Sequence, residues 1–187
     1  METIASNMDN ILEYPINLLK EPSEQLYMGI DCSSKAIHSV WVDDQERLIA
    51  QCKWGSKKKN FEERFLDFSV DFWDSLSKIK VILNDMVPVQ AAVEAAIYIQ
   101  NPKATIAIAS VAGLARFACH INGFECEFID NTKWKRDILG KGNASKVEIK
   151  EFAIDKWGKD KFPEQDFADA ACIALWKKRR LENGRRT

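Results

Sequence analysis

The sequence contains no run of apolar residues that approaches the roughly 20 needed to cross a bilayer. At the N-terminus no basic segment precedes an apolar core, so no secretory signal is found. The five cysteines are scattered and none forms a Cys-x-x-Cys pair, which argues against a disulfide framework and against a zinc site. We therefore expect no membrane partner and a reducing intracellular compartment: the cytoplasm or nucleoid of a host cell, or an organelle.

The formal net charge is only −1, yet the basic residues are unevenly distributed. Residues 131–150 carry six lysines and arginines against two acidic residues, and residues 177–187 carry six against one. Such clusters on a nearly neutral protein suit a polyanionic partner that is met on one face. For the C-terminal stretch, a solvated and frayed end explains the charge equally well.

The chain is long enough for one domain with a substantial core. It has 187 residues, of which 46% are hydrophobic. Residues 1–24 contain Pro15 and Pro22, which limit any helix there to short pieces, so we expect an N-terminal extension. The globular domain is predicted to span residues 25–180, followed by a basic tail at 181–187.

Hydrophobic patterns predict five strands and four helices. The strands are expected at residues 26–31, 36–42, 47–53, 89–94 and 125–129, and the helices at 61–83, 105–122, 145–157 and 165–180. Short polar turns make the first three strands an antiparallel meander, and the right-handed crossover rule places the fourth strand beside the first. The predicted fold class is α/β: a mixed five-stranded sheet, three antiparallel strands then two parallel, with helices on both faces.

Four carboxylates are expected to meet at one end of this sheet. Asp31 lies in the first strand, Glu94 ends the neighbouring strand, and Asp166 and Asp169 project from one side of the first turn of the last helix. Such groups repel one another unless cations lie among them, and hard oxygen ligands suit Mg²⁺ or Mn²⁺. Taken singly, Asp31 could be a turn residue and the aspartate pair a helix cap. Together they favour a metal site.

These residues and their order resemble the RuvC family of Holliday-junction resolvases, within the ribonuclease H-like superfamily. The resemblance spans residues 27–176 and rests on four blocks: Gly29-Ile-Asp31, Val93-Glu94 followed by Gln100-Asn-Pro-Lys103, the segment 135–146, and Asp166-Phe-Ala-Asp-Ala170. It implies that four carboxylates are catalytic and bind two Mg²⁺ ions, for which Mn²⁺ can substitute: Asp31, Glu94, Asp166 and Asp169.

The basic segment also matches this family. The family has a lysine five residues before a Gly-x-Gly turn and then a helix start of the type small-x-Lys, and this region contacts DNA near the scissile phosphate. The matching positions are Lys135, Gly140, Gly142 and Lys146, and the resemblance implies a catalytic role for Lys135. From the residues alone, five cations can neutralise phosphates while two glycines let the backbone approach closely: Lys133, Lys135, Arg136, Lys141 and Lys146, with Gly140 and Gly142.

The tryptophan of the basic segment and the two histidines are interpreted mainly as structural residues. Trp134 is expected in the core, with stacking on an unpaired base as the less favoured alternative. His38, within a strand, and His120, near the end of a helix, are interpreted as structural.

Two features depart from the family. Asp31 is followed by Cys32-Ser-Ser rather than by Pro-Gly or a similar turn, and the extension at residues 1–24 has no counterpart in the compact bacterial enzymes. Both suggest a divergent member, of viral or organellar origin.

The predicted function is that of a metal-dependent, structure-selective endonuclease that resolves four-way or other branched DNA junctions, a crossover-junction endodeoxyribonuclease. Hydrolysis would use two metal ions and no small-molecule cofactor. Symmetric cutting of a two-fold junction requires two active sites, so we expect a homodimer. By analogy with the family, the helices at 61–83 and 105–122 contribute to the dimer surface.

Three alternatives use the same fold. A ribonuclease H or a transposase-like nuclease would carry the same carboxylates and cut another substrate. An actin-like sugar kinase or ATPase half needs a Gly-rich phosphate loop after the first Asp, and Cys32-Ser33-Ser34 does not supply one. A non-catalytic DNA-binding protein would carry a vestigial metal site, against which the presence of all four carboxylates argues.

Overall fold

The computed structural model describes residues 24–83, 86–96 and 101–184. The predicted extension at residues 1–24 lies outside the described residues except for Glu24, and so do residues 185–187 of the predicted tail.

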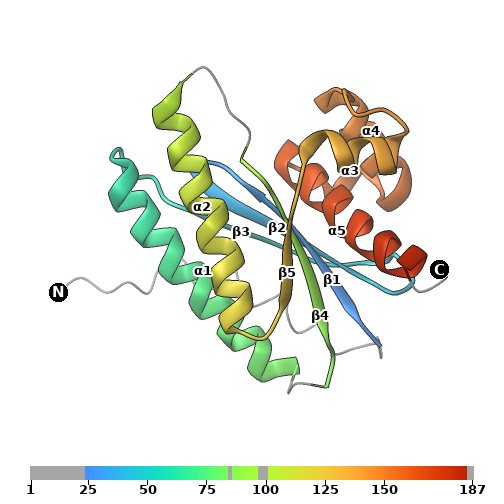
Figure 1. Ribbon diagram of the computed structural model, residues 1–187, viewed down its shortest axis with the longest axis horizontal. Coiled ribbons are helices and arrows are strands. Elements are labelled where there is room, and N and C mark those ends of the chain that lie inside the picture. Colours follow the sequence, from blue (N-terminus) through green and yellow to red (C-terminus); the bar gives the residue numbers. More distant parts are fainter. Residues whose placement is uncertain (1–23, 84–85, 97–100, 185–187) are drawn as a thin grey trace.

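A five-stranded sheet forms the centre of the domain (Figure 1). Its strands are β1 (Leu26–Cys32), β2 (Ala36–Asp43), β3 (Leu48–Gly55), β4 (Val89–Glu94) and β5 (Glu125–Ile129), in the order β3-β2-β1-β4-β5. The pairs β1–β2 and β2–β3 are antiparallel, whereas β1–β4 and β4–β5 are parallel. The predicted mixed sheet, with the fourth strand beside the first, is therefore confirmed.

Helices cover both faces of this sheet (Figure 1). They are α1 (Phe61–Leu83), α2 (Pro102–Ile121), α3 (Asn131–Leu139), α4 (Lys146–Trp157) and α5 (Gln165–Gly184), with a 3₁₀ turn at Lys159–Lys161. Helices α1 and α2 lie on one face, and α3, α4 and α5 lie on the other. The helix α3 was not predicted, and α5 continues past residue 180 into the predicted tail.

Side-chain caps explain where the helices of the basic segment begin. The Asp130 carboxylate accepts hydrogen bonds from the backbone N–H groups of Thr132 and Lys133, which starts α3. Ser145 and Glu148 form the predicted capping box at the start of α4. Gly140, with φ of 80°, ends α3 in the left-handed conformation that glycine adopts without strain.

Two hydrophobic cores sandwich the sheet, one beneath α1 and α2 and one beneath α3, α4 and α5. The second core holds α5 directly against β1. A Cβ atom at Gly29 would lie 2.0 Å from the carbonyl oxygen of Ala170 and 2.3 Å from the nitrogen of Ala174, so only glycine permits this approach. This contact brings the first turn of α5 to the end of β1.

The sequence-based expectation of no membrane-spanning run needs one correction. By length and composition alone, α2 is long and apolar enough to cross a membrane. A third of its apolar window is buried inside the domain, where α2 packs on α1 and on the sheet. The core helix of a globular domain passes the same test, so this finding is weak evidence for a membrane span.

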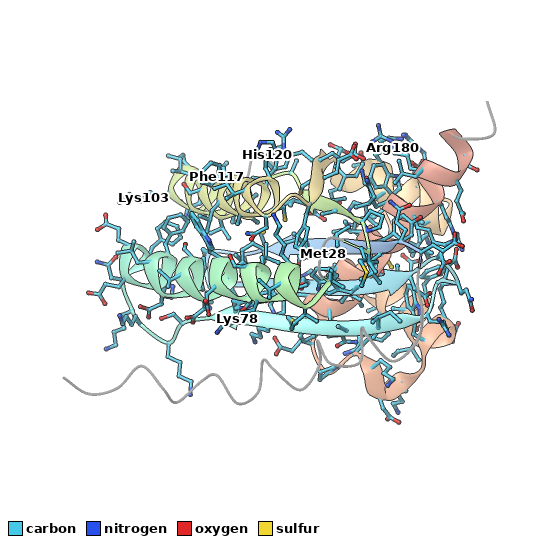
Figure 2. All side chains as sticks on the ribbon, turned by 90° about the horizontal axis from the view of Figure 1, so that it is seen from below. Met28, Lys78, Lys103, Phe117, His120 and Arg180 are labelled. Atoms are coloured by element: carbon cyan, nitrogen blue, oxygen red, sulfur yellow. The ribbon has the colours of Figure 1, made fainter. Side chains whose placement is uncertain are left out.

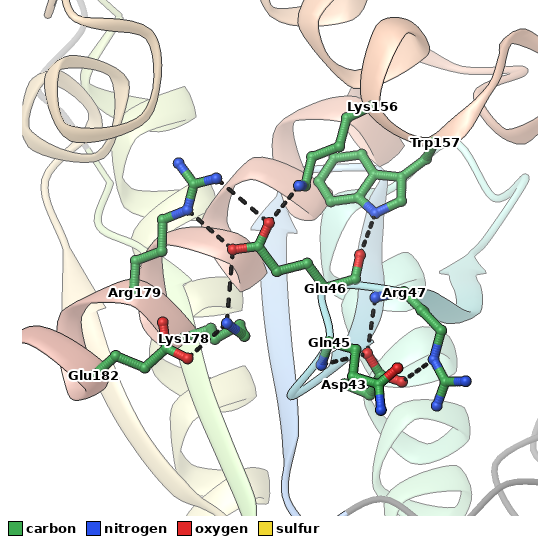
Figure 3. A network of polar contacts seen from close by, with 9 residues as sticks. All are labelled: Asp43, Gln45, Glu46, Arg47, Lys156, Trp157, Lys178, Arg179 and Glu182. Carbon is green, nitrogen blue, oxygen red and sulfur yellow. Dashed lines mark hydrogen bonds and ion pairs between the residues drawn. The ribbon is translucent and has the colours of Figure 1, made fainter.

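The turn between β2 and β3 is tied to α4 and α5 through Glu46 (Figure 3). The Glu46 carboxylate accepts hydrogen bonds from Lys156 and from Arg179, whose Nε lies 3.1 Å away, and Lys178 Nζ lies 3.6 Å from it. Its backbone carbonyl accepts a 2.8 Å hydrogen bond from Trp157 Nε1. Burial alone would raise the pKa of Glu46, but the hydrogen bonds and charges of Arg179 and Lys156 outweigh it and lower the pKa to about 2.

We predict that Glu46→Gln lowers the free energy of unfolding at pH 7 by about 1.5–3 kcal/mol, the range of hydrogen bonds to charged groups. Because the folded-state pKa is depressed, this stability is present above the unfolded-state pKa of about 4.3 and is lost as the pH falls through about 2. Urea unfolding at pH 7, 4 and 2.5 should therefore show a difference that shrinks with acid. The matched control is Glu151→Gln, an exposed glutamate on α4. An equal loss in the control, or a loss independent of pH, would contradict this account.

Candidate functional site

Three aspartates meet where the carboxyl end of β1 faces the first turn of α5. Asp31 is the penultimate residue of β1, and Asp166 and Asp169 lie at the start of α5. One carboxylate oxygen from each lies within 4.8 Å of the others. The structure thus brings together three of the four carboxylates predicted for the metal site.

The electrostatics of this cluster are unfavourable without a cation. Burial raises the pKa of Asp31 well above its usual value, and the charges of Glu94, Asp169 and Asp166 raise it further, whereas Lys146 lowers it. Burial likewise raises the pKa of Asp169 to about 6. A divalent cation would offset both the burial and the repulsion, and the all-oxygen donor set fits Mg²⁺ or Mn²⁺.

Glu94, the fourth predicted carboxylate, lies beside this group at the end of β4. Its charge acts on Asp31, but both of its oxygens are engaged by α3. Asn131 Nδ2 donates to Oε1 at 2.7 Å, and Trp134 Nε1 donates to Oε2 at 2.9 Å. These hydrogen bonds fix the orientation of the carboxylate in the way that supporting residues orient metal ligands.

Trp134 is fully buried, which confirms the interpretation as a core residue and contradicts the alternative of base stacking. Its ring packs in the second core, and its indole N–H is committed to Glu94. The ammonium of Lys135 lies 5.5 Å from the centre of the same ring. Lys135 is therefore linked to Glu94 through the indole.

The predicted DNA-binding cations fall into two groups. Lys133 pairs with Asp137 at 3.0 Å, and Lys141 pairs with Glu148. Within the described part of the chain, the other three form no ion pair with a carboxylate: Lys135, Arg136 and Lys146. The charge of Lys146 lowers the pKa of both Asp31 and Asp169, so this lysine is electrostatically coupled to the carboxylate cluster.

The two glycines of the basic segment have structural roles within the fold. Gly140 supplies the left-handed end of α3, as described above. At Gly142 a Cβ atom would lie 2.9 Å from the carbonyl oxygen of Thr132, so a side chain there would clash with the start of α3. The predicted close approach to DNA is not needed to explain either glycine.

His38 lies beside the aspartates, a placement that the sequence analysis, which interpreted this residue as structural, did not predict. It pairs with Asp31 across β1 and β2 and is only 2% exposed. Its Nε2 lies 3.3 Å from Glu164 Oε2, and its Nδ1 lies 3.7 Å from Asp166 Oδ2. Glu164 in turn binds Lys53 of β3. The short turn after Asp31 was the available signal, because it sets the register that places His38 opposite Asp31.

Comparisons with curated proteins support the resemblance over part of the chain. No family model matches it. The chain is 31% identical over 97 residues to the crossover junction endodeoxyribonuclease RuvC of Francisella tularensis subsp. novicida, which covers 52% of this chain and 57% of that protein. The corresponding RuvC of Francisella philomiragia is 29% identical over the same length. The chain thus spans about half the length of the curated relatives it matches.

Solved structures extend the likeness over the whole domain. A structure of Thermus thermophilus RuvC matches with a TM-score of 0.69 and 17% identity, covering 86% of this chain and 97% of that one. The same protein in complex with a Holliday junction substrate matches with a TM-score of 0.69 and 18% identity, covering 86% and 96%. The predicted ribonuclease H-like fold and the resemblance to RuvC are confirmed.

The raised pKa of Asp169 leads to a prediction for the metal-free protein. Because the folded-state pKa is raised, the contribution of the Asp169 carboxyl group to stability is fully present below the unfolded-state pKa of about 3.9. This contribution is lost as the pH rises through about 6. In EDTA, Asp169→Asn should therefore raise the free energy of unfolding by about 1–3 kcal/mol at pH 8 and by almost nothing at pH 4.

Urea unfolding measures both values, with Asp155→Asn, an exposed aspartate on α4, as the control. The control should change stability by less than about 0.5 kcal/mol at either pH. A variant that is less stable than the wild type at pH 8 would show that the carboxylate cluster is not repulsive.

Proposed function

We propose that the protein is a metal-dependent endonuclease that resolves four-way or other branched DNA junctions, and the likeness to RuvC is the starting point. The observation that carries this proposal is the group of three aspartates at the end of β1, with Lys146 beside it. At this position on a ribonuclease H-like sheet, the three aspartates would bind hard cations next to a phosphodiester. The Thermus protein with the same fold was solved with a Holliday junction, which supports branched DNA as the substrate.

The residues of the site have distinct roles in this proposal. Asp31, Asp166 and Asp169 bind divalent cations. Glu94, at the end of β4, is the fourth ligand, and α3 orients its carboxylate through Asn131. Two Mg²⁺ ions, or Mn²⁺ in their place, would supply an activated water and stabilise the leaving oxygen, which leaves 5′-phosphate and 3′-hydroxyl ends. Lys146 contributes positive charge where the scissile phosphate would lie.

The proposed DNA path follows the cations that form no ion pair with a carboxylate among the described residues. Lys135, Arg136 and Lys146 can meet phosphates without breaking an ion pair, whereas Lys133 and Lys141 must first leave Asp137 and Glu148. The first three should therefore contribute most to affinity. The ammonium of Lys135 lies over the Trp134 ring, and the indole N–H of Trp134 binds Glu94. We therefore assign the predicted catalytic role to Lys135.

A homodimer is part of the proposal, since two sites are needed for paired incisions. The outer faces of α1 and α2 carry large apolar side chains that stay exposed, and Trp73 and Phe117 meet edge to face between the two helices, with ring centres 6.5 Å apart. Exposed fractions on α1 are 64% for Leu66, 66% for Val70 and 44% for Trp73, and on α2 they are 65% for Ile106 and 54% for Phe117. Figure 2 shows Phe117 on the outer side of α2, away from the sheet. An apolar face of this kind suits a second copy of the chain.

Other parts of the sequence-based interpretation stay predictions: the intracellular, reducing compartment and the viral or organellar origin. The competing functions are outcomes of one experiment. A ribonuclease H or transposase-like enzyme would cut a different nucleic acid, and a non-catalytic DNA-binding protein would cut none.

The experiment is cleavage, with Mg²⁺ or Mn²⁺, of an end-labelled four-way junction, a flap, a linear duplex and an RNA–DNA hybrid. We expect paired nicks in the junction and a loss of at least about 100-fold in Asp31→Asn, because a ligand of the reacting metal is removed. Asp160→Asn, an exposed aspartate in the 3₁₀ turn, is the control and should cut normally. Cleavage of the hybrid alone would replace the proposal by a ribonuclease H activity, and junction binding without any cleavage would leave a binding protein.

The dimer is tested separately by sedimentation at about 10 µM protein. The double variant Trp73→Glu, Phe117→Glu places charge in the apolar face, so it should sediment as a monomer and lose paired nicking, whereas the wild type sediments as a dimer. Val147→Glu, which is 66% exposed on α4, is the matched control. A wild-type monomer, or a double variant that still dimerises, would exclude this face.

A further inference from the structure

One nitrogen of His38 has no role in the site as described so far. The ring is buried, and its plane is fixed by an edge contact with Phe167, whose centre lies 5.0 Å away. Its Nε2 faces Glu164 Oε2 at 3.3 Å. Both Glu164 oxygens accept hydrogen bonds from Lys53 Nζ, at 2.7 and 2.6 Å, so the carboxylate is ionised and can only accept. The Nε2 atom therefore carries the proton that is donated to Glu164.

The opposite nitrogen, Nδ1, then presents a lone pair inside the protein. Among the described residues it has no hydrogen-bond partner, although it is fully buried. Its nearest ionic neighbour is Asp166 Oδ2 at 3.7 Å, which also carries lone pairs. A buried acceptor left without a partner destabilises the folded protein, and a carboxylate opposite it adds repulsion. A cation bound between these two atoms would satisfy both.

We propose that His38 Nδ1 is a nitrogen ligand of a metal ion that it shares with Asp166. This inference rests on the metal site of the proposed function and adds a ligand to it. The Glu164–Lys53 pair acts as the orienting group: a carboxylate that accepts from one ring nitrogen fixes the tautomer and directs the other nitrogen at the metal. His38 is placed by the β1–β2 register opposite Asp31, so a rigid strand supplies the ligand.

A nitrogen ligand changes which metal the site prefers. Imidazole favours later first-row metals over Mg²⁺, whose preferred ligands are oxygens. With His38 in place, the ratio of Mn²⁺ or Co²⁺ affinity to Mg²⁺ affinity should exceed that of a site made only of carboxylates. Removal of the imidazole should therefore weaken Mn²⁺ binding more than Mg²⁺ binding.

The test is electron spin-echo spectroscopy of Mn²⁺ bound to the full chain, which detects ¹⁴N nuclei coordinated to the metal. The sequence has two histidines, and the second, His120, is exposed on the outer side of α2 (Figure 2). We expect ¹⁴N modulation from coordinated imidazole in the wild type and in His120→Gln, and none in His38→Gln. Mn²⁺ affinity, measured by titration, should fall at least about tenfold in His38→Gln.

The outcomes separate this inference from the proposed function. Bound Mn²⁺ without ¹⁴N modulation in the wild type would overturn the ligand assignment and leave the carboxylate site intact, and this result does not depend on how any variant folds. A wild type that binds no Mn²⁺ would refute the proposed metal site as well. Glu164→Gln should keep the ¹⁴N signal and lose several-fold in Mn²⁺ affinity; an unchanged affinity would overturn the orienting role of Glu164.

Discussion

Helix α5 packs so closely on β1 that Gly29 has no room for a side chain, and the positions of the site residues depend on this contact. A Cβ atom there would meet the backbone of Ala170 and Ala174 at 2.0 and 2.3 Å. Asp31 lies two residues after Gly29 in the same strand. The approach therefore brings carboxylate oxygens of Asp166 and Asp169 to within 4.8 Å of an Asp31 oxygen, close enough for one cation to bind all three residues. Burial in the second core stabilises the contact, and its cost is the mutual repulsion of the carboxylates that it assembles.

The surrounding elements supply the support that such a site needs. From β4 and α3 come Glu94 and the two donors that orient it, Asn131 and Trp134. From β2 and the residues before α5 come His38 and Glu164. Each of these groups stands on a regular element or next to one, so the site is held by a rigid scaffold. The cost of this arrangement in folding free energy is a cluster of partly buried charges, whose repulsion a bound cation or protonation relieves.

The sheet could be predicted because its rules are local: short turns set the meander, and crossover handedness sets the position of β4. Helix α3 was missed because only Trp134 and Ile138 of its nine residues are buried, too few for a helical period to emerge among charged neighbours. The structure brings the four predicted carboxylates near one another, but the orientation of Glu94 was not predicted, because it depends on side chains 37 and 40 residues away. The place of His38 beside Asp166 was not predicted for the same reason, since its partner Glu164 lies 126 residues along the chain.

The central claim is that this carboxylate cluster binds divalent cations, and anomalous diffraction from crystals soaked in Mn²⁺ tests it most directly. The account predicts anomalous peaks at ligand distance, about 2.0–2.3 Å, from oxygens of Asp31, Asp166 and Asp169, and their loss in crystals of Asp31→Asn. Crystals with an accessible site and no peak among these aspartates at millimolar Mn²⁺ would contradict it.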